Sequence, residues 1–293
     1  MKKLLNGKKA VACLCAVVML LSSAMAALPS VVSAVKQKEI WDGSKAESYA
    51  GGDGSAGNPY LIKTPAQLYR AIYAGKENGV NISDGKYYRM ENDIYLNDVS
   101  ADNWYTKEGL HEWVKLDSGK EIGDFRGVFD GNGYVVHGLY YSDTADYAAL
   151  IPKTGSYTGN AVVIKNVGIE DAYVQGKYTG ALVGCVDGSR NGKNTITVSA
   201  CYADDSVYLK GSQSSGLVAW LFNYYFTMEN CASRVRMIGT PNTSEPRGSL
   251  LGAMWLNASE NGATNVDNAK KITIKSSYAV LHYEDRNAGF SAV

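Results

Sequence analysis

Hydrophobic and polar residues alternate with a period of two through most of the second half of the chain. From about residue 145 onward, short apolar stretches are separated by Gly, Asn, Asp and Ser. This alternation predicts half-buried β-strands, and the intervening residues are the ones that form turns. Glycines inside the stretches would each cost a helix about 1 kcal/mol. The pattern therefore predicts a domain of short strands.

The strands recur as an imperfect repeat of two half-units. The second half-unit reads Gly180-Ala181-Leu182-Val183-Gly184. Its anchor position recurs at steps of 32, 35, 33 and 40 residues, at Leu150, Leu182, Leu217, Leu250 and Phe290. Repeats of this length, built from strand-like segments, bury a core by stacking on one another. We therefore expect an all-β solenoid whose coils hold two or three strands each and are clear from about Leu150.

The first half-unit aligns cysteines of neighbouring repeats. It reads Val198–Ala203 and recurs as Met228–Ser233. This register places Cys201 and Cys231 in one column, about 5 Å apart across adjacent coils. A disulfide between them is compatible with that spacing but is not favoured, since small buried thiols explain the column as well. Cys185 is expected to be unpaired.

One helix is predicted, over about residues 64–76. Thr64 can cap it, Pro65 suits the first helical position, and Gln67 completes a capping box. It follows a polar N-terminal segment, residues 35–58, and a short strand at residues 59–62. We expect the folded domain to span residues 59–293.

Residues 1–34 have the layout of a secretory signal peptide. Four lysines precede an uncharged apolar run, and small residues follow. The run is shorter than the roughly 20 residues that span a bilayer, and no later apolar stretch reaches that length, so no transmembrane segment is expected in the mature chain. We expect an exported protein, secreted or attached to the cell surface. Without residues 1–34 the mature chain has 25 basic and 29 acidic side chains. This excess of negative charge argues against nucleic acid as a partner.

Three blocks of sequence resemble those of GLUG-motif repeat proteins, which are bacterial exported or surface proteins and often adhesin-like. Gly180–Gly184 and its copies resemble the glycine- and leucine-rich signature, over about residues 145–293. Phe125–Tyr134 followed by His137–Tyr140 resembles the segment that precedes such repeats, and Gly52–Leu68 is similar to their N-terminal block. The resemblance implies a pectate-lyase-like right-handed parallel β-helix with the helix capping its N-terminal end. That architecture does not by itself specify a reaction.

The pair Asp204-Asp205 is the most enzyme-like feature of the sequence. Polysaccharide hydrolases use clustered carboxyl groups as acid and base. In the repeat register, Glu170, Asp204 and Arg234 share a column, which an opposite-charge ladder on a solvated face explains equally well. The catalytic candidates are therefore Asp204, Asp205, Glu170 and Arg234, although we favour a protein without catalysis. A second expected column holds Ser206, Arg236 and His282.

No metal or cofactor site is predicted. His111, His137 and His282 lie in separate segments without the paired spacing of zinc ligands. Residues 130–133, Asp-Gly-Asn-Gly, carry oxygen donors but lack the pattern of a calcium-binding loop, so a turn is expected there. Structural calcium is therefore not indicated.

Aromatic residues are the candidates for ligand binding, namely Trp104, Trp113, Tyr140 and Tyr225. Exposed tyrosines and tryptophans stack on sugar rings or anchor protein interfaces. The alternative is that they pack as ladders along the coils. We expect a non-catalytic, adhesin-like module that recognises a glycan or a protein at a cell surface. The alternatives are a carbohydrate-active enzyme of the β-helix class, either a polysaccharide lyase or a glycoside hydrolase, and a structural spacer of a larger surface protein.

Overall fold

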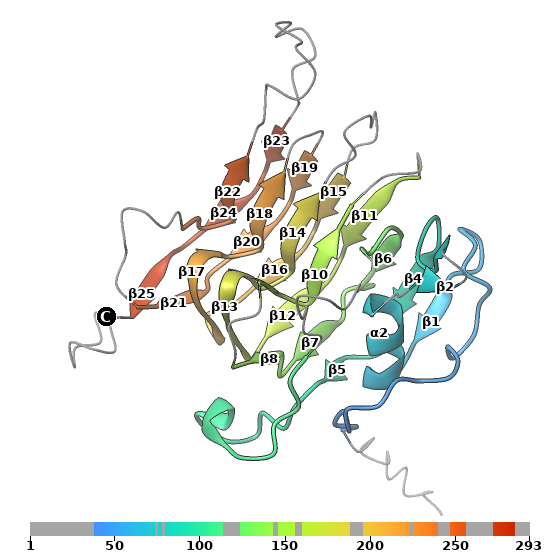
Figure 1. The fold of residues 1–293 in the computed structure, drawn as a ribbon, viewed down its shortest axis with the longest axis horizontal. Coiled ribbons are helices and arrows are strands. Elements are labelled where there is room, and N and C mark those ends of the chain that lie inside the picture. Colours follow the sequence, from blue (N-terminus) through green and yellow to red (C-terminus); the bar gives the residue numbers. More distant parts are fainter. Residues whose placement is uncertain are drawn as a thin grey trace, which may run out of the picture. The chain divides into compact units, whose positions relative to one another are not determined.

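The computed structural model describes residues 38–284, except 74–75, 78–79, 114–123, 143–145, 156–159, 188–195, 223–225, 240–246 and 256–271. The predicted signal peptide and the positions Tyr225 and Phe290 lie outside the described residues. From Glu39 onward the chain is an all-β, right-handed parallel β-helix with one α-helix, as predicted. Figure 1 shows its strands stacked coil upon coil.

Four parallel sheets form the walls of this solenoid in the described part of the chain. The first, called the β11 sheet, contains β1 (Tyr60–Ile62), β4 (Tyr87–Met90), β6 (Val128–Asp130), β11 (Val162–Lys165), β15 (Ile196–Ser199), β19 (Phe226–Glu229) and β23 (Ile272–Lys275). The second, called the β12 sheet, contains β5 (Ile94–Tyr95), β7 (Val135–His137), β12 (Gly168–Glu170), β16 (Tyr202–Ala203), β20 (Ala232–Ser233) and β24 (Tyr278–Ala279).

The other two walls complete each coil. The β13 sheet contains β8 (Tyr140–Tyr141), β13 (Ala172–Gly180), β17 (Val207–Ser215), β21 (Arg236–Ile238) and β25 (His282–Glu284), and β9 (Tyr147–Ala148) also pairs with β13. The β14 sheet contains β10 (Ile151–Thr154), β14 (Val183–Asp187), β18 (Val218–Phe222) and β22 (Leu251–Trp255). A full coil therefore has four strands, where the sequence predicted two or three. An antiparallel pair, β2 (Lys76–Glu77) and β3 (Val80–Asn81), lies outside these sheets.

The coils begin well before Leu150, the point from which the repeat is clear in the sequence. Strands β1, β4 and β6 already stack in register in the β11 sheet, well before Leu150. The polar segment also packs on the solenoid, since Ile40 bridges to Tyr95 and Trp41 is buried. Long connections between these first strands hide the repeat period from the sequence.

The helix α2 spans Pro65–Ile72 and is shorter than predicted. Thr64 caps it by accepting a hydrogen bond from the Gln67 backbone N–H at 3.3 Å, as expected. The side chain of Gln67 accepts from Lys63 N–H. Leu68 and Ile72 are buried in the core, so this helix covers part of the interior near the first coils. A short 3₁₀ helix, η1, spans Trp104–Thr106.

The core follows from the alternation in the β11 sheet. Inward residues Phe129, Ile164, Val198 and Met228 pair in register and are fully buried. The predicted leucine column is confirmed by hydrogen bonds from Ile151 N–H to the Leu182 carbonyl and onward through Leu217 and Leu250. Burial of these apolar side chains, at roughly 25 cal/mol per Å², supplies the main stabilisation.

The corner between the β11 and β12 sheets has the same form in successive coils. Two residues connect the strands, and the first has a left-handed backbone with φ of 46–56° at Asn166, Ala200, Asn230 and Ser276. In three of these coils the second corner residue, Val167, Cys201 or Cys231, is buried in the core. Asparagine tolerates the left-handed region better than alanine does.

Replacing Ala200 by asparagine is therefore expected to stabilise the protein. Ala200 is exposed and has φ of 51°, and its cost relative to asparagine is about 0.5–1 kcal/mol. Urea unfolding followed by circular dichroism should show a higher midpoint for Ala200→Asn. A lower midpoint would mean that this corner does not carry the strain.

The three cysteines of the described chain are free thiols and are buried. Cys201 and Cys231 lie in neighbouring positions of adjacent coils, as the sequence register predicted. Burial raises the pKa of Cys185 to about 12. That thiol is therefore a packing element rather than a reactive group.

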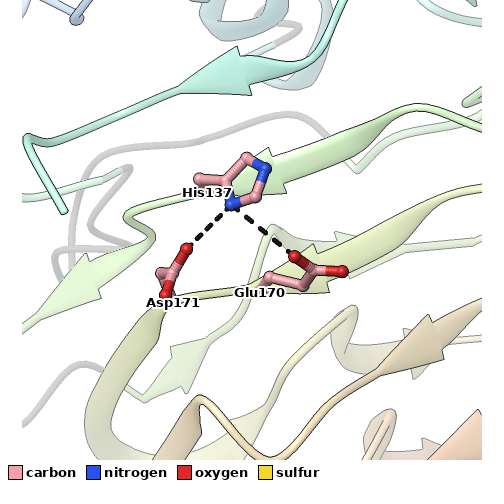
Figure 2. A group of neighbouring side chains, drawn as sticks. All are labelled: His137, Glu170 and Asp171. Atoms are coloured by element: carbon pink, nitrogen blue, oxygen red, sulfur yellow. Dashed lines mark hydrogen bonds and ion pairs between the residues drawn. The ribbon is translucent and has the colours of Figure 1, made fainter. Parts of the chain in front are cut away.

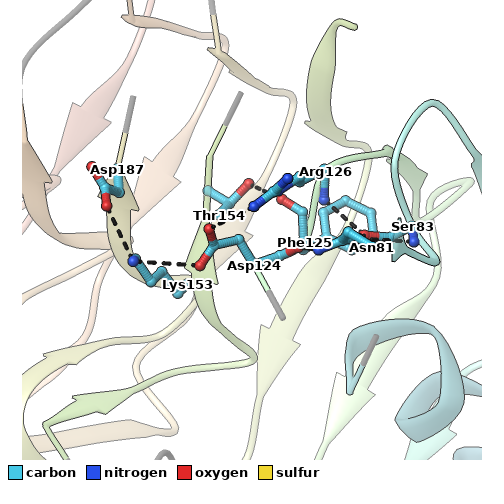
Figure 3. A network of polar contacts seen from close by, with 8 residues as sticks. All are labelled: Asn81, Ser83, Asp124, Phe125, Arg126, Lys153, Thr154 and Asp187. Atoms are coloured by element: carbon cyan, nitrogen blue, oxygen red, sulfur yellow. Dashed lines mark hydrogen bonds and ion pairs between the residues drawn. The ribbon is translucent and has the colours of Figure 1, made fainter. Parts of the chain in front are cut away.

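A polar network ties the segment before β6 to later coils (Figure 3). Lys153 lies between Asp124, at 3.4 Å, and Asp187, at 3.1 Å. Asn81 donates to the Asp124 carbonyl at 2.6 Å, and Ser83 donates to the Asn81 side chain at 2.7 Å. Buried polar groups need such partners, and the network links strand β3, strand β10 and strand β14.

Candidate functional site

Tyrosines and small residues alternate along the outer face of the β12 sheet. In register across the coils, this column reads Gly168, Tyr202, Ala232 and Tyr278. A Cβ atom at Gly168 would lie 2.4 Å from the Tyr202 ring, so the glycine allows that ring to lie over β12. The hydroxyl of Tyr202 donates to Glu170 Oε1 at 2.6 Å, which fixes the ring there.

A hollow of about 460 Å³ opens on the other side of Tyr202. Its lining includes Tyr202, Ala232 and Tyr278, with Asn230 and Arg234 contributing polar groups. Strands are about 4.8 Å apart, so the two tyrosines are separated by roughly 10 Å, with the small Ala232 between them. Tyr278 is 60% exposed and offers its ring to solvent.

Two of the four catalytic candidates, Asp204 and Arg234, line this hollow, and Glu170 and Asp205 contact lining residues. Asp204 N–H bonds the Ile169 carbonyl and Arg234 N–H bonds the Ala203 carbonyl, so Glu170, Asp204 and Arg234 follow one another across coils. Arg234 lies 3.5 Å from Asp205, and both side chains are about half exposed. Burial raises the pKa of the Asp204 carboxyl, and repulsion from Glu170 and Asp205 adds to the effect.

The second predicted column, which held Ser206, Arg236 and His282, is wrong in one of its two pairings. Arg236 pairs with Tyr208, not with Ser206, while its pairing with His282 is confirmed. The cause is the turn between β16 and β17, which holds Asp204, Asp205 and Ser206, whereas Arg234 alone fills the equivalent turn before Val235. The Asp204 carboxylate accepts from the Ser206 backbone N–H and hydroxyl, which stabilises the longer turn.

A second group of side chains lies on the same face, in the two coils that precede the hollow. His137 on β7 faces Glu170 on β12, and Asp171 follows Glu170 in the chain (Figure 2). His137 Nδ1 is 2.9 Å from Asp171 Oδ2 and 3.9 Å from Glu170 Oε2. In the sequence, His137 lies in a segment separate from the other histidines, so no site was predicted around it. Aligning His137-Gly138-Leu139-Tyr140 with Glu170-Asp171-Ala172-Tyr173 would have placed it opposite Glu170.

Trp104 and Trp113, two of the four predicted ligand-binding aromatics, are buried in the structure. Trp113 is 2% exposed, donates to the Leu150 carbonyl at 2.8 Å and contacts the Trp41 ring. Trp104 is also buried and lies against Tyr140, with ring centroids 6.1 Å apart. These two indoles therefore offer no free face to a sugar.

Tyr140 belongs to a ladder on the β13 sheet, which was the alternative reading of these aromatics. It pairs in register with Tyr173, which in turn pairs with Tyr208. Tyr105 of η1 stacks on Tyr173, with centroids 4.8 Å apart and planes 12° apart. Tyr225 lies outside the described residues, so its placement stays a prediction.

Comparisons with known proteins show limited similarity. No family model matches the chain. A curated protein of Evansella cellulosilytica, named "Putative Gly-rich membrane protein", is 29% identical over 146 residues. The match covers 49% of this chain and 15% of that protein, so the chain spans a small part of its relative's length. Within the part of this chain that the structure describes, no helix is long and apolar enough to cross a bilayer.

A solved structure with a similar course of the chain is that of "a putative immunoglobulin A1 protease" from Bacteroides ovatus. It superposes with a TM-score of 0.43 at 13% identity and covers 81% of each chain.

Proposed function

We propose that this protein is an exported, adhesin-like module that binds a glycan in the hollow between Tyr202 and Tyr278. The hollow is the observation that carries the proposal. Its volume of about 460 Å³ lies within the range of roughly 300–1,000 Å³ typical of small-ligand sites. Export is supported by the signal-peptide pattern of residues 1–34.

The chemistry of the lining suits a sugar. Aromatic faces pack against the apolar C–H face of a sugar ring, and Tyr202 and Tyr278 stand on either side of Ala232. The amide of Asn230 and the guanidinium of Arg234 can bond hydroxyl or carboxylate groups of a glycan. The combination of aromatic and polar side chains in the lining favours a hydroxylated ligand over a purely apolar one.

Two contacts favour binding without turnover. The Asp204 carboxylate is held by Ser206, and Arg234 is engaged by Asp205. A general acid or base has to reach the reacting bond with a free atom. Asp204 Oδ1 serves the turn and Asp205 Oδ2 serves the surface ion pair, and these structural roles support a binding module.

Binding should be measured with the purified full chain on neutral glycans, pectins and other uronans. Tyr278→Ala is expected to weaken binding about tenfold, equivalent to about 1.4 kcal/mol, because one stacking face is lost. Tyr87→Ala is the matched control, since Tyr87 is a half-buried tyrosine of the β11 sheet, away from the hollow. Equal affinities of the two variants would contradict the site.

An enzyme is the second candidate, because Tyr202 donates to Glu170 at 2.6 Å beside the hollow and could act in proton transfer. Asp204→Asn separates the two functions. Asp204 lines the hollow, so the deciding readout of this variant is turnover and not affinity. A natural chain that binds glycan without turnover would support our proposal, whereas a measured turnover that is lost in Asp204→Asn would replace it with an enzyme. Complete absence of glycan and protein ligands would favour the structural spacer.

The same variant has a stability signature. The folded-state pKa of Asp204 is raised, so its ionised form opposes folding above that pKa, and the penalty disappears as pH falls below the unfolded value of about 3.8. Asp204→Asn should therefore be at least as stable as the natural chain at pH 7. The difference should shrink toward pH 3.

A further inference from the structure

We propose that His137, Glu170 and Asp171 form a binding site for a divalent transition-metal cation, with Zn²⁺ as the reference ion. One ligand atom from each residue, His137 Nδ1 and one carboxylate oxygen each from Glu170 and Asp171, all lie within 4.8 Å of one another. Figure 2 shows the imidazole of His137 with Nδ1 directed toward both carboxylates. The site does not depend on glycan binding.

The distances suit a small cation after minor side-chain rotation. Zinc binds histidine nitrogen and carboxylate oxygen at about 2.0–2.2 Å, which places tetrahedral ligand atoms about 3.4 Å apart. The two measured separations from His137 Nδ1, 2.9 Å to Asp171 and 3.9 Å to Glu170, lie on either side of that value. The side chains are 13%, 30% and 35% exposed for His137, Glu170 and Asp171, so water can reach the remaining coordination position.

The backbone explains why two consecutive carboxylates face one histidine. Successive side chains of a strand point to opposite faces, but Asp171 has φ of 49° and leaves the extended conformation directly after β12. Its N–H bonds Ser206 Oγ at 2.6 Å, and its carbonyl accepts from Gly138 N–H at 2.9 Å. Asp171 is thereby held beside the strand that contains His137.

A single proton on His137 cannot bridge to both carboxylates, whereas a single metal cation can contact the imidazole and both carboxylates. His137 Nδ1 carries at most one hydrogen, and it can bond only one of the two carboxylates well. The hydrogen-bond distance to Asp171 is good, which leaves Glu170 Oε2 beyond hydrogen-bond range at 3.9 Å. A cation in place of the proton would contact all three atoms and offset both negative charges.

More negative charge surrounds the site. The carboxylates of Asp93, Glu170 and Asp171 together raise the pKa of the nearby Tyr95 hydroxyl, after the larger effect of burial. Asp204 also lies close enough to Glu170 for the two charges to repel. A concentration of carboxylates around one imidazole favours the uptake of a cation.

Neighbouring aromatic groups hold the ligands in position. The Tyr95 ring stacks on the His137 imidazole, with centroids 4.6 Å apart and planes 8° apart. Tyr202 bonds Glu170 Oε1 and leaves Oε2 on the side of His137. Outer contacts that fix ring and carboxylate orientation are a usual part of metal sites.

The donor set selects the class of cation. Imidazole nitrogen suits Zn²⁺ and related transition metals, while Ca²⁺ requires six to eight oxygen ligands. One nitrogen and two carboxylates with a free position match an open zinc coordination sphere. We therefore expect Zn²⁺ to bind much more tightly than Ca²⁺ or Mg²⁺.

Isothermal titration of the metal-stripped full chain with Zn²⁺ tests the site, with Ca²⁺ and Mg²⁺ in separate titrations. We expect one Zn²⁺ per chain, and at least tenfold weaker binding in His137→Gln and in Asp171→Asn. His282→Gln is the matched control, because His282 is an exposed histidine at the far end of the solenoid. Tyr278→Ala should leave Zn²⁺ affinity unchanged, which separates this site from the glycan hollow.

Circular dichroism identifies any variant that fails to fold, and Asp171→Asn keeps the side-chain shape and its backbone contacts if His137→Gln is unstable. X-ray absorption of the zinc complex should show one imidazole and oxygen ligands. Three outcomes would overturn the proposal: no saturable binding, equal binding of Ca²⁺, or undiminished Zn²⁺ affinity in Asp171→Asn and His137→Gln.

Discussion

Gly131→Ala is expected to lower the free energy of unfolding by about 3 kcal/mol, which is a large loss for one methyl group. A Cβ atom at this position would lie 2.4 Å from the Asn166 carbonyl oxygen and 2.5 Å from Val167 Cβ. Both atoms belong to the corner of the next coil, and Gly131 N–H bonds the Lys165 carbonyl at 2.8 Å. The added carbon can be accommodated only if two coils move apart.

Chemical unfolding of Gly131→Ala by urea, followed by circular dichroism, measures this loss. Gly133→Asn is the control in the same turn. Gly133 has φ of 83°, which asparagine tolerates, and nothing lies within 4 Å of an added Cβ atom. The control should lose about 1 kcal/mol or less. Similar losses in both variants would show that turn conformation, rather than the approach of the next coil, sets the cost.

Leu182→Ala is expected to cost about 3–4 kcal/mol, because it opens a cavity in the middle of the leucine column. Leu182 is fully buried, and hydrogen bonds join it to the coils of Leu150 and Leu217 on its two sides. Neighbours on both sides are held by the sheet and cannot collapse into the space. The urea midpoint and the thermal midpoint should both fall clearly.

Leu250→Ala provides the comparison for this cavity. Leu250 occupies the same column in a later coil but is only half-buried. Its truncation removes less contact, so the expected loss is about half that of Leu182→Ala. A loss at Leu250 equal to that at Leu182 would show that stability is not graded along the solenoid.

Local pattern was sufficient for those parts of the fold that repeat with constant spacing. The leucine column and the Cys201–Cys231 neighbourhood were predicted because the strands that carry them have similar lengths in successive coils. The error at Arg236 has the opposite origin, since, counted between paired residues, the turn before β17 is two residues longer than the turn before β21 and shifts the pairing between these two strands. Helix α2 started where its cap predicted, but it ended at Ile72, where no strong stop signal stands in the sequence.

The candidate site was only partly accessible from the sequence. Glu170, Asp204 and Arg234 were placed together because they lie within the recognised repeats. His137 was missed because its strand precedes them. The burial of Trp104 and its contact with Tyr140 depend on η1 packing over the β13 sheet, a contact between distant segments that strand alternation does not encode.

The two-residue corner between the β11 and β12 sheets has a consequence for how the chain can change length. Between β11 and β12, and in the three coils that follow, two residues make this connection. The connections from the β14 sheet back to the β11 sheet hold 7, 8, 3 and 16 residues in successive coils. Length varies at this corner in every coil, and also between β21 and β22, whereas the two-residue corner keeps its length. Tyr202 and Tyr278 each directly follow a two-residue corner, so segments can grow or shrink elsewhere in the coil while these two rings keep their positions on the β12 sheet.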